Sequence, residues 1–232
     1  MTNYKQIYQT QAEQYEYLVA HEDYKGNILP ALQAIRPMAQ TTIVELGAGT
    51  GRLTRLLAPL ARRLIACDIA QPMLEVARQQ LRRDGRQNWQ LVVSDNRAMA
   101  VARETADATI AGWSLGHSVS WYGNNWRHEI GQCLSEMRRV LRPGGTIIIL
   151  ETLGTNQLRP IPPTPELAAY YQWLEQDLGF QSTWIRTDYQ YPSLAEAVAS
   201  VRFFFGEAMA NDVERKKSVI VPECTGIWWQ SY

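Results

Sequence analysis

A glycine-rich turn is the segment of this 232-residue sequence best suited to ligand chemistry. Residues 47–51 read Gly-Ala-Gly-Thr-Gly and follow an apolar, β-branched run at residues 42–46. Glycines in such a turn let a ligand approach the backbone closely, and free N–H groups of the following helix can bind it. The dinucleotide pattern G-x-G-x-x-G would place its third glycine at position 52, which is Arg52 here. The spacing therefore disfavours a dinucleotide as the ligand.

Three more side chains with useful chemistry follow short apolar runs. Asp68 and Asp95 each stand just after such a run, and His117 lies a few residues beyond another. His117 is the candidate general base, because an unperturbed imidazole has a pKa of about 6.5 and can accept a proton near neutrality. A histidine in a loop can equally serve only as a hydrogen-bonding group. Asp95 could instead cap the next helix, a common role for aspartate.

An ordered sheet would bring these residues together, and the sequence predicts one. Apolar β-branched runs alternate with helical segments from residue 41 onward. We expect strands at residues 42–46, 64–67, 91–93, 108–111 and 146–150, and helices from residue 52, over 71–83 and over 126–141. This alternation implies right-handed βαβ crossovers and a mostly parallel sheet covered by helices on both faces. In such open α/β sheets, ligands bind beyond the carboxyl ends of the strands.

The segments that flank this core are expected to be mainly helical. Before the core, we predict helices over residues 3–20 and 27–35. After it, we predict a helix over 165–178, a strand over 184–189 and a helix over 193–209. Residues 218–221 and 226–229 read as a hairpin-like strand pair or as one strand interrupted at Pro222. We expect a single domain over residues 1–232, with a helical lid at 1–38, a cofactor-binding core at 39–151 and a substrate-side insertion with the final strands at 152–232.

The motif around the glycine turn resembles the first motif of class I S-adenosylmethionine-dependent methyltransferases. The matching features are Glu45-x-Gly47-x-Gly49-x-Gly51, Asp68, Asp95 and a Leu-x-Pro-Gly-Gly turn at residues 141–145. The resemblance covers about residues 41–151 and is closest to the small-molecule branch that includes quinone-biosynthesis methyltransferases. It implies a Rossmann-like, doubly wound, mostly parallel seven-stranded sheet with helices on both faces and an N-terminal helical lid.

The resemblance also implies which residues bind the cofactor, S-adenosyl-L-methionine. They are Glu45, Gly47, Gly49, Gly51, Asp68, Ile69, Met73, Asp95, Asn96 and Trp113. By this analogy Glu45 orients the glycine loop or the cofactor ammonium, Asp68 holds the ribose, and Asp95 with Asn96 covers the edge of the adenine. Met73 could equally be a core residue, because its predicted helix also contains several other apolar residues.

Composition narrows the class of partner. The chain has 23 basic and 23 acidic residues, and its arginine pairs are scattered, so it has no basic tract of the kind that binds nucleic acid. No apolar run approaches the length of about 18 residues that a membrane span needs, and the N-terminus lacks a signal-peptide core. We therefore expect a cytoplasmic protein. The cysteines are far apart and the histidines have no suitably spaced partners, so we expect neither disulfides nor a metal site.

Tyrosine and tryptophan are unusually frequent, with 11 Tyr and 8 Trp against 4 Phe. Aromatic side chains with a polar group suit half-buried walls better than deep cores. We expect the acceptor side of the site to be formed by Tyr4, Tyr8, Tyr15, Tyr24, Trp121 and Tyr122. A tyrosine face that packs on the rim of the sheet is equally compatible with the pattern. The aromatic residues favour a small apolar or aromatic acceptor, and the chain is expected to be a monomer or a homodimer.

The function that the sequence favours is transfer of a methyl group to a small molecule by in-line displacement, with S-adenosyl-L-homocysteine as the product. Because the cofactor supplies the reactivity, alignment is the main task of the protein, and a base is needed only if the acceptor must lose a proton. Two alternatives stay open. One is an NAD(P)-dependent Rossmann oxidoreductase, which Arg52 disfavours, and the other is a non-catalytic S-adenosylmethionine-binding module.

Overall fold

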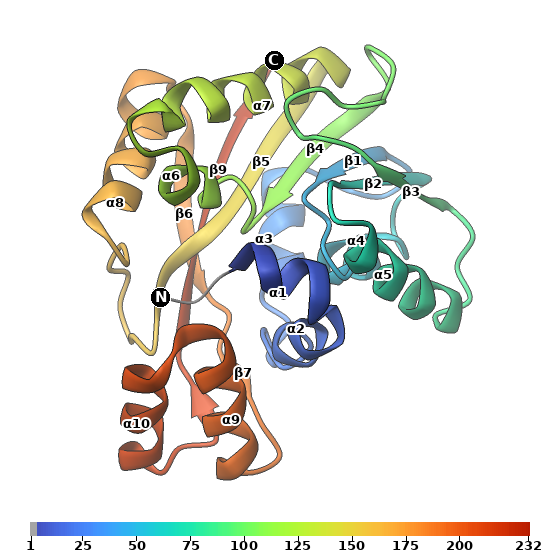
Figure 1. The fold of residues 1–232 in the computed structure, drawn as a ribbon. Coiled ribbons are helices and arrows are strands. Elements are labelled where there is room, and N and C mark those ends of the chain that lie inside the picture. Colours follow the sequence, from blue (N-terminus) through green and yellow to red (C-terminus); the bar gives the residue numbers. More distant parts are fainter. Residues whose placement is uncertain (1–3) are drawn as a thin grey trace.

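Parallel strands form the centre of the protein in a computed structural model that describes residues 4–232 (Figure 1). The strand order in the seven-stranded sheet is β3-β2-β1-β4-β5-β9-β6. The parallel strands are β1 (Thr42–Leu46), β2 (Arg63–Asp68), β3 (Trp89–Val93), β4 (Ala106–Gly112) and β5 (Leu141–Thr155). β9 (Glu223–Ser231) lies antiparallel between β5 and β6 (Gln181–Arg186). The predicted mostly parallel, seven-stranded sheet is confirmed.

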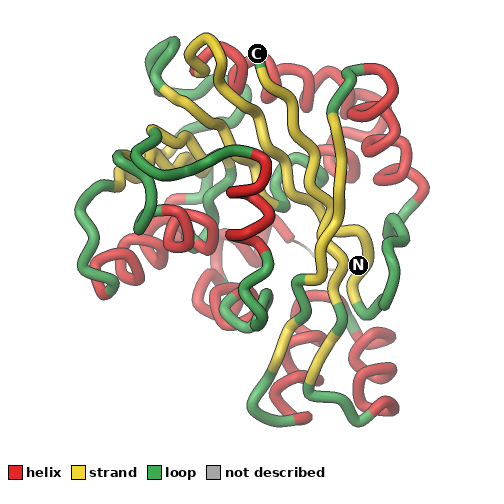
Figure 2. Tube along the Cα trace, turned by 180° about the vertical axis from the view of Figure 1, so that it is seen from behind, coloured by secondary structure: helices red, strands yellow, loops and turns green. Residues whose placement is uncertain are grey.

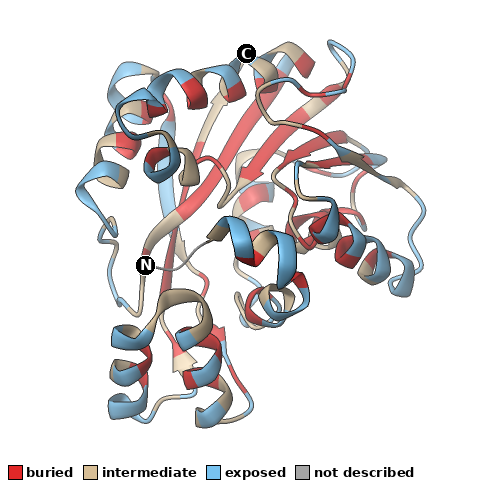
Figure 3. Cartoon of the chain, viewed as in Figure 1, coloured by how far each residue is buried: buried red, intermediate tan, exposed pale blue. Residues whose placement is uncertain are grey.

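Helices cover both faces of this sheet because its strands are apolar on both sides. Along β1, Val44 and Leu46 pack with α6 (His117–Tyr122), α7 (Trp126–Val140) and α8 (Pro165–Gln172). Ile43 points the other way and packs with α3 (Ile28–Ile35), α4 (Arg52–Leu57) and α5 (Gln71–Arg83). Seen from behind, α3 lies across the sheet (Figure 2), and the central strands form the most buried layer (Figure 3).

The N-terminal segment forms two short helices where one was predicted. α1 (Tyr4–Thr10) and α2 (Ala12–Val19) meet at Gln11, whose backbone leaves the helical region (φ −133°, ψ 33°). The expected first helical residue, at position 3, lies outside the described residues. Both helices pack against α5. Asp23 then caps α3, because its carboxylate accepts the backbone N–H groups of Asn27 and Ile28 at 2.7 and 3.0 Å.

Residues 189–221 form a small lobe below the main sheet in Figure 1. β7 (Tyr189–Gln190) and β8 (Ile220–Val221) pair with each other, and α9 (Leu194–Phe205) packs on α10 (Glu207–Lys216). The single helix predicted over 193–209 is wrong, because the chain reverses at Gly206 with φ 92°. Of the two expectations for residues 218–229, the hairpin-like pair is wrong, since β8 and β9 belong to different sheets. The interruption at Pro222 is confirmed, because β8 ends at Val221 and β9 begins at Glu223.

The remaining boundaries differ from expectation in smaller ways. The strand predicted over 184–189 is divided, because β6 ends at Arg186 and β7 begins at Tyr189. The helix predicted over 165–178 is α-helical only to Gln172 and continues as a π-helical turn, Trp173–Asp177. Within residues 4–232, no helix is both long enough and apolar enough to cross a membrane.

Candidate active site

A cavity of about 370 Å³ opens beside the carboxyl ends of β1, β2 and β4. Eight of the ten residues expected to bind a cofactor line it: Glu45, Gly47, Gly49, Asp68, Ile69, Met73, Asn96 and Trp113. His117 also lines it, together with four of the expected acceptor-side residues: Tyr8, Tyr15, Trp121 and Tyr122. Residues far apart in the sequence therefore share one cavity at the edge of the sheet where open α/β folds bind ligands.

Four predicted site residues lie outside the lining of this cavity: Tyr4, Tyr24, Gly51 and Asp95. Tyr24 is on the surface between α2 and α3, with 38% of its area exposed. Tyr4 is near the cavity, with its ring centroid 5.5 Å from that of His117. Gly51 has a structural task instead, since a Cβ there would lie only 3.0 Å from the Cβ of Ala77 on α5.

The loop between β1 and α4 keeps the floor of the cavity open. Gly47 and Gly49 have φ values of 64° and 56°, which favour glycine over residues with a side chain. A Cβ at position 47 would also collide with the side chain of Ser114. The loop is thus shaped so that bare backbone borders the cavity, as a closely bound ligand requires.

Asp68, at the end of β2, fixes this loop and faces the cavity. Its Oδ2 accepts the Gly49 N–H at 2.8 Å, and its Oδ1 accepts the Ala70 N–H at the same distance. Burial raises the pKa of Asp68, and these backbone N–H groups oppose that rise. A carboxylate oxygen has two lone pairs, so each oxygen can accept one more donor, such as a ribose hydroxyl.

Glu45 is buried beneath the same loop. Its Oε2 accepts the Thr54 hydroxyl at 2.6 Å, which ties β1 to α4. Burial raises the pKa of Glu45 to about 8. The position matches a role in orienting the loop, and Glu45 also borders the cavity.

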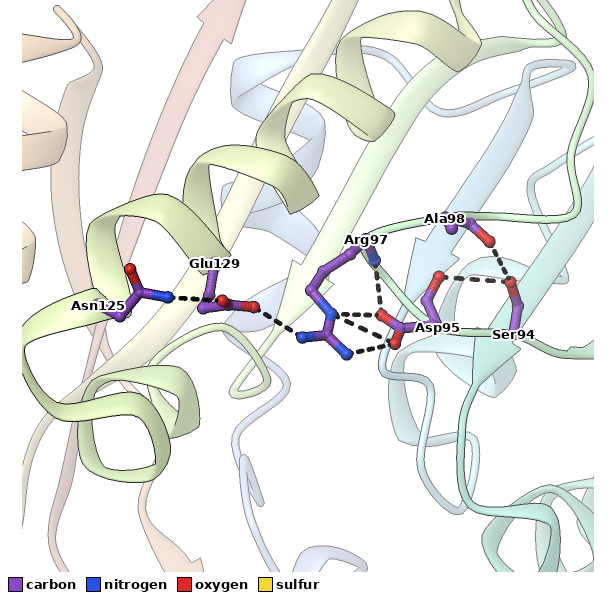
Figure 4. Close-up of polar contacts among 6 residues, drawn as sticks. All are labelled: Ser94, Asp95, Arg97, Ala98, Asn125 and Glu129. Carbon is purple, nitrogen blue, oxygen red and sulfur yellow. Dashed lines mark hydrogen bonds and ion pairs between the residues drawn. The ribbon is translucent and has the colours of Figure 1, made fainter.

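Asp95 does not face the cavity as expected, because Arg97 holds its carboxylate (Figure 4). The Arg97 guanidinium donates to Asp95 and to Glu129 of α7, each at 2.6 Å. The hydrogen bonds from Arg97 lower the pKa of Asp95. The neighbouring Asn96 lines the cavity instead, and its buried Oδ1 has no hydrogen-bond partner among residues 4–232. A buried unpaired acceptor is costly, so a ligand donor would be favourable there.

His117 begins α6 and lies among aromatic rings. Its Nε2 is 2.8 Å from the Tyr8 hydroxyl, and the Trp121 ring stacks on it with centroids 5.0 Å apart. Burial lowers the pKa of His117 to about 4, and burial raises the pKa of Tyr8 well above its usual value. Both groups are therefore neutral near pH 7.

The sequence alone did not identify Arg52 as part of the site. It showed only that Arg52 stands where the dinucleotide-binding pattern would have its third glycine. The Arg52 side chain lines the cavity, and its guanidinium lies 3.4 Å from the centre of the Trp113 ring. It also forms a buried ion pair with Glu22, which accepts the Thr187 hydroxyl at 3.0 Å. The only sequence signal was an arginine directly after the last glycine of the turn, and its partners are distant in sequence.

Known proteins resemble this chain in both sequence and fold. A family model described as a methyltransferase domain matches residues 44–149. Over 119 residues the chain is 33% identical to the demethylmenaquinone methyltransferase of Clavibacter sepedonicus, covering 51% of this chain and 44% of that protein. Over 161 residues it is 29% identical to the malonyl-[acyl-carrier protein] O-methyltransferase of Salmonella typhimurium, covering 69% and 55%. The chain thus spans about half the length of these relatives.

Solved structures show the same fold at low sequence identity. A SAM-dependent methyltransferase from Aquifex aeolicus superposes with a TM-score of 0.55 and 13% identity. The match covers 98% of this chain and 93% of that chain.

Proposed function

We propose that this chain is a class I S-adenosylmethionine-dependent methyltransferase and transfers a methyl group from that cofactor to a small-molecule acceptor. The observation that supports this most directly is the composition of the cavity. The glycine loop, Asp68 and Asn96 line it together with His117 and a cluster of aromatic residues. Cofactor and acceptor would therefore meet in one space beside the carboxyl ends of the strands.

The cofactor side has the groups that an adenosyl ligand requires. Asp68 can accept the two ribose hydroxyls, and Asn96 offers its unpaired oxygen to an amino group. Ile69 is 69% exposed and Met73 is 3% exposed, yet both border the cavity, where they can contact the adenine ring. When bound, S-adenosylmethionine supplies an activated methyl group on a sulfonium centre. The residues of the chain bind it, align it and exclude water.

The acceptor side favours an apolar or aromatic molecule. Tyr8, Tyr15, Trp121 and Tyr122 give it aromatic walls, and these can also stabilise a nearby sulfonium cation by about 0.5–2 kcal/mol. The relatives are named for demethylmenaquinone and for malonyl-[acyl-carrier protein], and neither name is that of a nucleic acid. The zero formal net charge and scattered arginines likewise favour a small acceptor over a polyanion. The proposed place of the reaction is the cytoplasm.

Binding of S-adenosyl-L-homocysteine tests this proposal through Asp68. Loss of hydrogen bonds to a charged acceptor costs about 1.5–3 kcal/mol, so Asp68→Ala should weaken binding roughly 10- to 100-fold in calorimetry. Asp84→Ala is the matched control, because Asp84 is a surface carboxylate that pairs with Arg55 outside the cavity. Equal affinity in the two variants would contradict the assignment. Titration with NADH tests the alternative that the protein is an oxidoreductase. An oxidoreductase should bind NADH more tightly than S-adenosyl-L-homocysteine, and a methyltransferase should show the reverse preference.

A further inference from the structure

The N-terminal helix brings a hydroxyl group into the cavity beside His117. Tyr8 of α1 and His117 of α6 are 109 positions apart in the sequence, yet both line the cavity and their polar atoms are 2.8 Å apart. Lys5 and Gln9 of the same helix also line the cavity. Helix α1 therefore contributes directly to the wall of the site.

The imidazole of His117 is held in a defined orientation. The Trp121 ring stacks on it at an interplanar angle of 11°, and the Tyr8 ring meets it edge-on at 67°. The preceding residue, Gly116, donates its N–H to Oε1 of the buried Glu151 at 2.8 Å, which fixes the start of α6 to β5. Elements α1, α6 and β5 thus together hold the Tyr8 hydroxyl and the His117 imidazole in contact.

The direction of this hydrogen bond depends on which nitrogen of the neutral imidazole carries the proton. With the proton on Nδ1, Nε2 accepts from the Tyr8 hydroxyl. A neutral imidazole has one nitrogen that accepts, and a tyrosine hydroxyl that donates to it still has lone pairs for a second donor. The titratable groups around the pair are Tyr4 and Lys5 of α1, Tyr15 of α2, Asp68 of β2 and Glu151 of β5. The Lys5 ammonium lies 4.9 Å from the centre of the Trp121 ring. The Tyr8 oxygen is therefore available to accept a proton from a molecule in the cavity.

We propose that Tyr8 receives the hydroxyl proton of the acceptor and passes its own proton to Nε2 of His117, so that the acceptor is a small aromatic molecule methylated on oxygen. This inference rests on the proposed function. The acceptor O–H bond and the S–CH3 bond break, and the new bond joins the acceptor oxygen to the methyl carbon. The positive charge passes from sulfur to the imidazolium of His117, which then releases its proton to water. Tyr8 is the catalytic residue in this scheme, and His117 acts through it.

The experiment measures methyl transfer from labelled S-adenosylmethionine to phenol, catechol, 4-hydroxybenzoate and 4-nitrophenol. Tyr8→Phe should lower kcat for the weakly acidic acceptor phenol about 100-fold, as loss of a general acid–base group does, with little change in KM. For 4-nitrophenol, which is mostly ionised at pH 8, the loss should be much smaller. Tyr17→Phe is the matched control, because Tyr17 is on α2, 40% exposed and outside the cavity.

The pH profile distinguishes a proton relay from a structural role. With phenol, wild-type kcat should change little between pH 6 and 8, because His117 stays neutral there. In His117→Gln, kcat should rise about tenfold per pH unit as phenol itself ionises. Equal losses for all four acceptors, or parallel pH profiles, would overturn the proposal. Binding of S-adenosyl-L-homocysteine without methylation of any of them would also overturn it and leave the cofactor site intact. Absence of that binding would refute the proposed function as well.

Discussion

Asn96 and Asp95 are neighbours in the chain but have different surroundings. Arg97 joins Asp95 to Glu129, so the Asp95 carboxylate ties the loop after β3 to α7 (Figure 4). Asn96 borders the cavity, and its buried side-chain oxygen has no donor within the described residues. The sequence identified both positions, but it could not tell which one meets a ligand, because that depends on a glutamate 32 positions beyond Arg97.

We expect Asn96→Ala to weaken binding of S-adenosyl-L-homocysteine about 2- to 12-fold, because one hydrogen bond worth roughly 0.5–1.5 kcal/mol is lost. Asp95→Asn keeps the size of the side chain and should change the affinity less than about twofold, since its oxygens face Arg97. Calorimetric titration of both variants measures the difference. A larger loss in Asp95→Asn than in Asn96→Ala would reverse the assignment of the two residues.

At the scale of elements, sequence periodicity predicted most strands and long helices of the core. It missed the helix breaks at Gln11 and Gly206 and the strand break between Arg186 and Tyr189. β1, β2 and α5 match expectation within one residue because each has an uninterrupted apolar pattern between clear end signals. The break at Gly206 was missed because the helical pattern continues through it, and an isolated glycine is tolerated in helices. The reversal there lets Ala210 and Val213 of α10 pack with Val201 of α9. That packing is tertiary and leaves no local signal.

Gly206 supports this reversal through its backbone, and the prediction is a loss of stability on substitution. With φ 92° and ψ 176°, it occupies a region that is essentially restricted to glycine. Gly206→Ala should lower the free energy of unfolding by about 1–3 kcal/mol, measured by urea denaturation. The matched control is Gly131→Ala within α7, where a Cβ would meet no described atom within 4 Å. That change should raise stability by about 0.5–1 kcal/mol. Similar losses in both variants would show that Gly206 has no special role.

At the scale of the whole molecule, several carboxyl groups are buried, although the formal net charge is zero. Glu45, Glu151 and Glu223 are buried at the carboxyl-end half of the sheet, and burial raises the pKa of each to about 8. Glu223 accepts the Thr152 hydroxyl at 2.7 Å, but its second oxygen has no partner in the described part of the chain. All three are mostly protonated at neutral pH in the folded protein, whereas an unfolded glutamate, with a pKa of about 4.5, is ionised.

These buried carboxyl groups predict that stability decreases as the pH rises. A group whose pKa is higher in the folded state contributes its full stabilisation below the unfolded value of 4.5 and loses it as the pH rises to about 8. His117 acts in the opposite direction, but its contribution changes mainly below pH 6.5. Between pH 6.5 and 8 the free energy of unfolding should therefore decrease. Glu223→Gln, which has no charge to suppress, should make this decrease shallower in urea denaturation. Glu13→Gln is the control, because Glu13 is exposed, and it should leave the pH dependence of the free energy of unfolding unchanged. If Glu223→Gln and wild type show the same pH dependence, Glu223 is ionised in the folded protein.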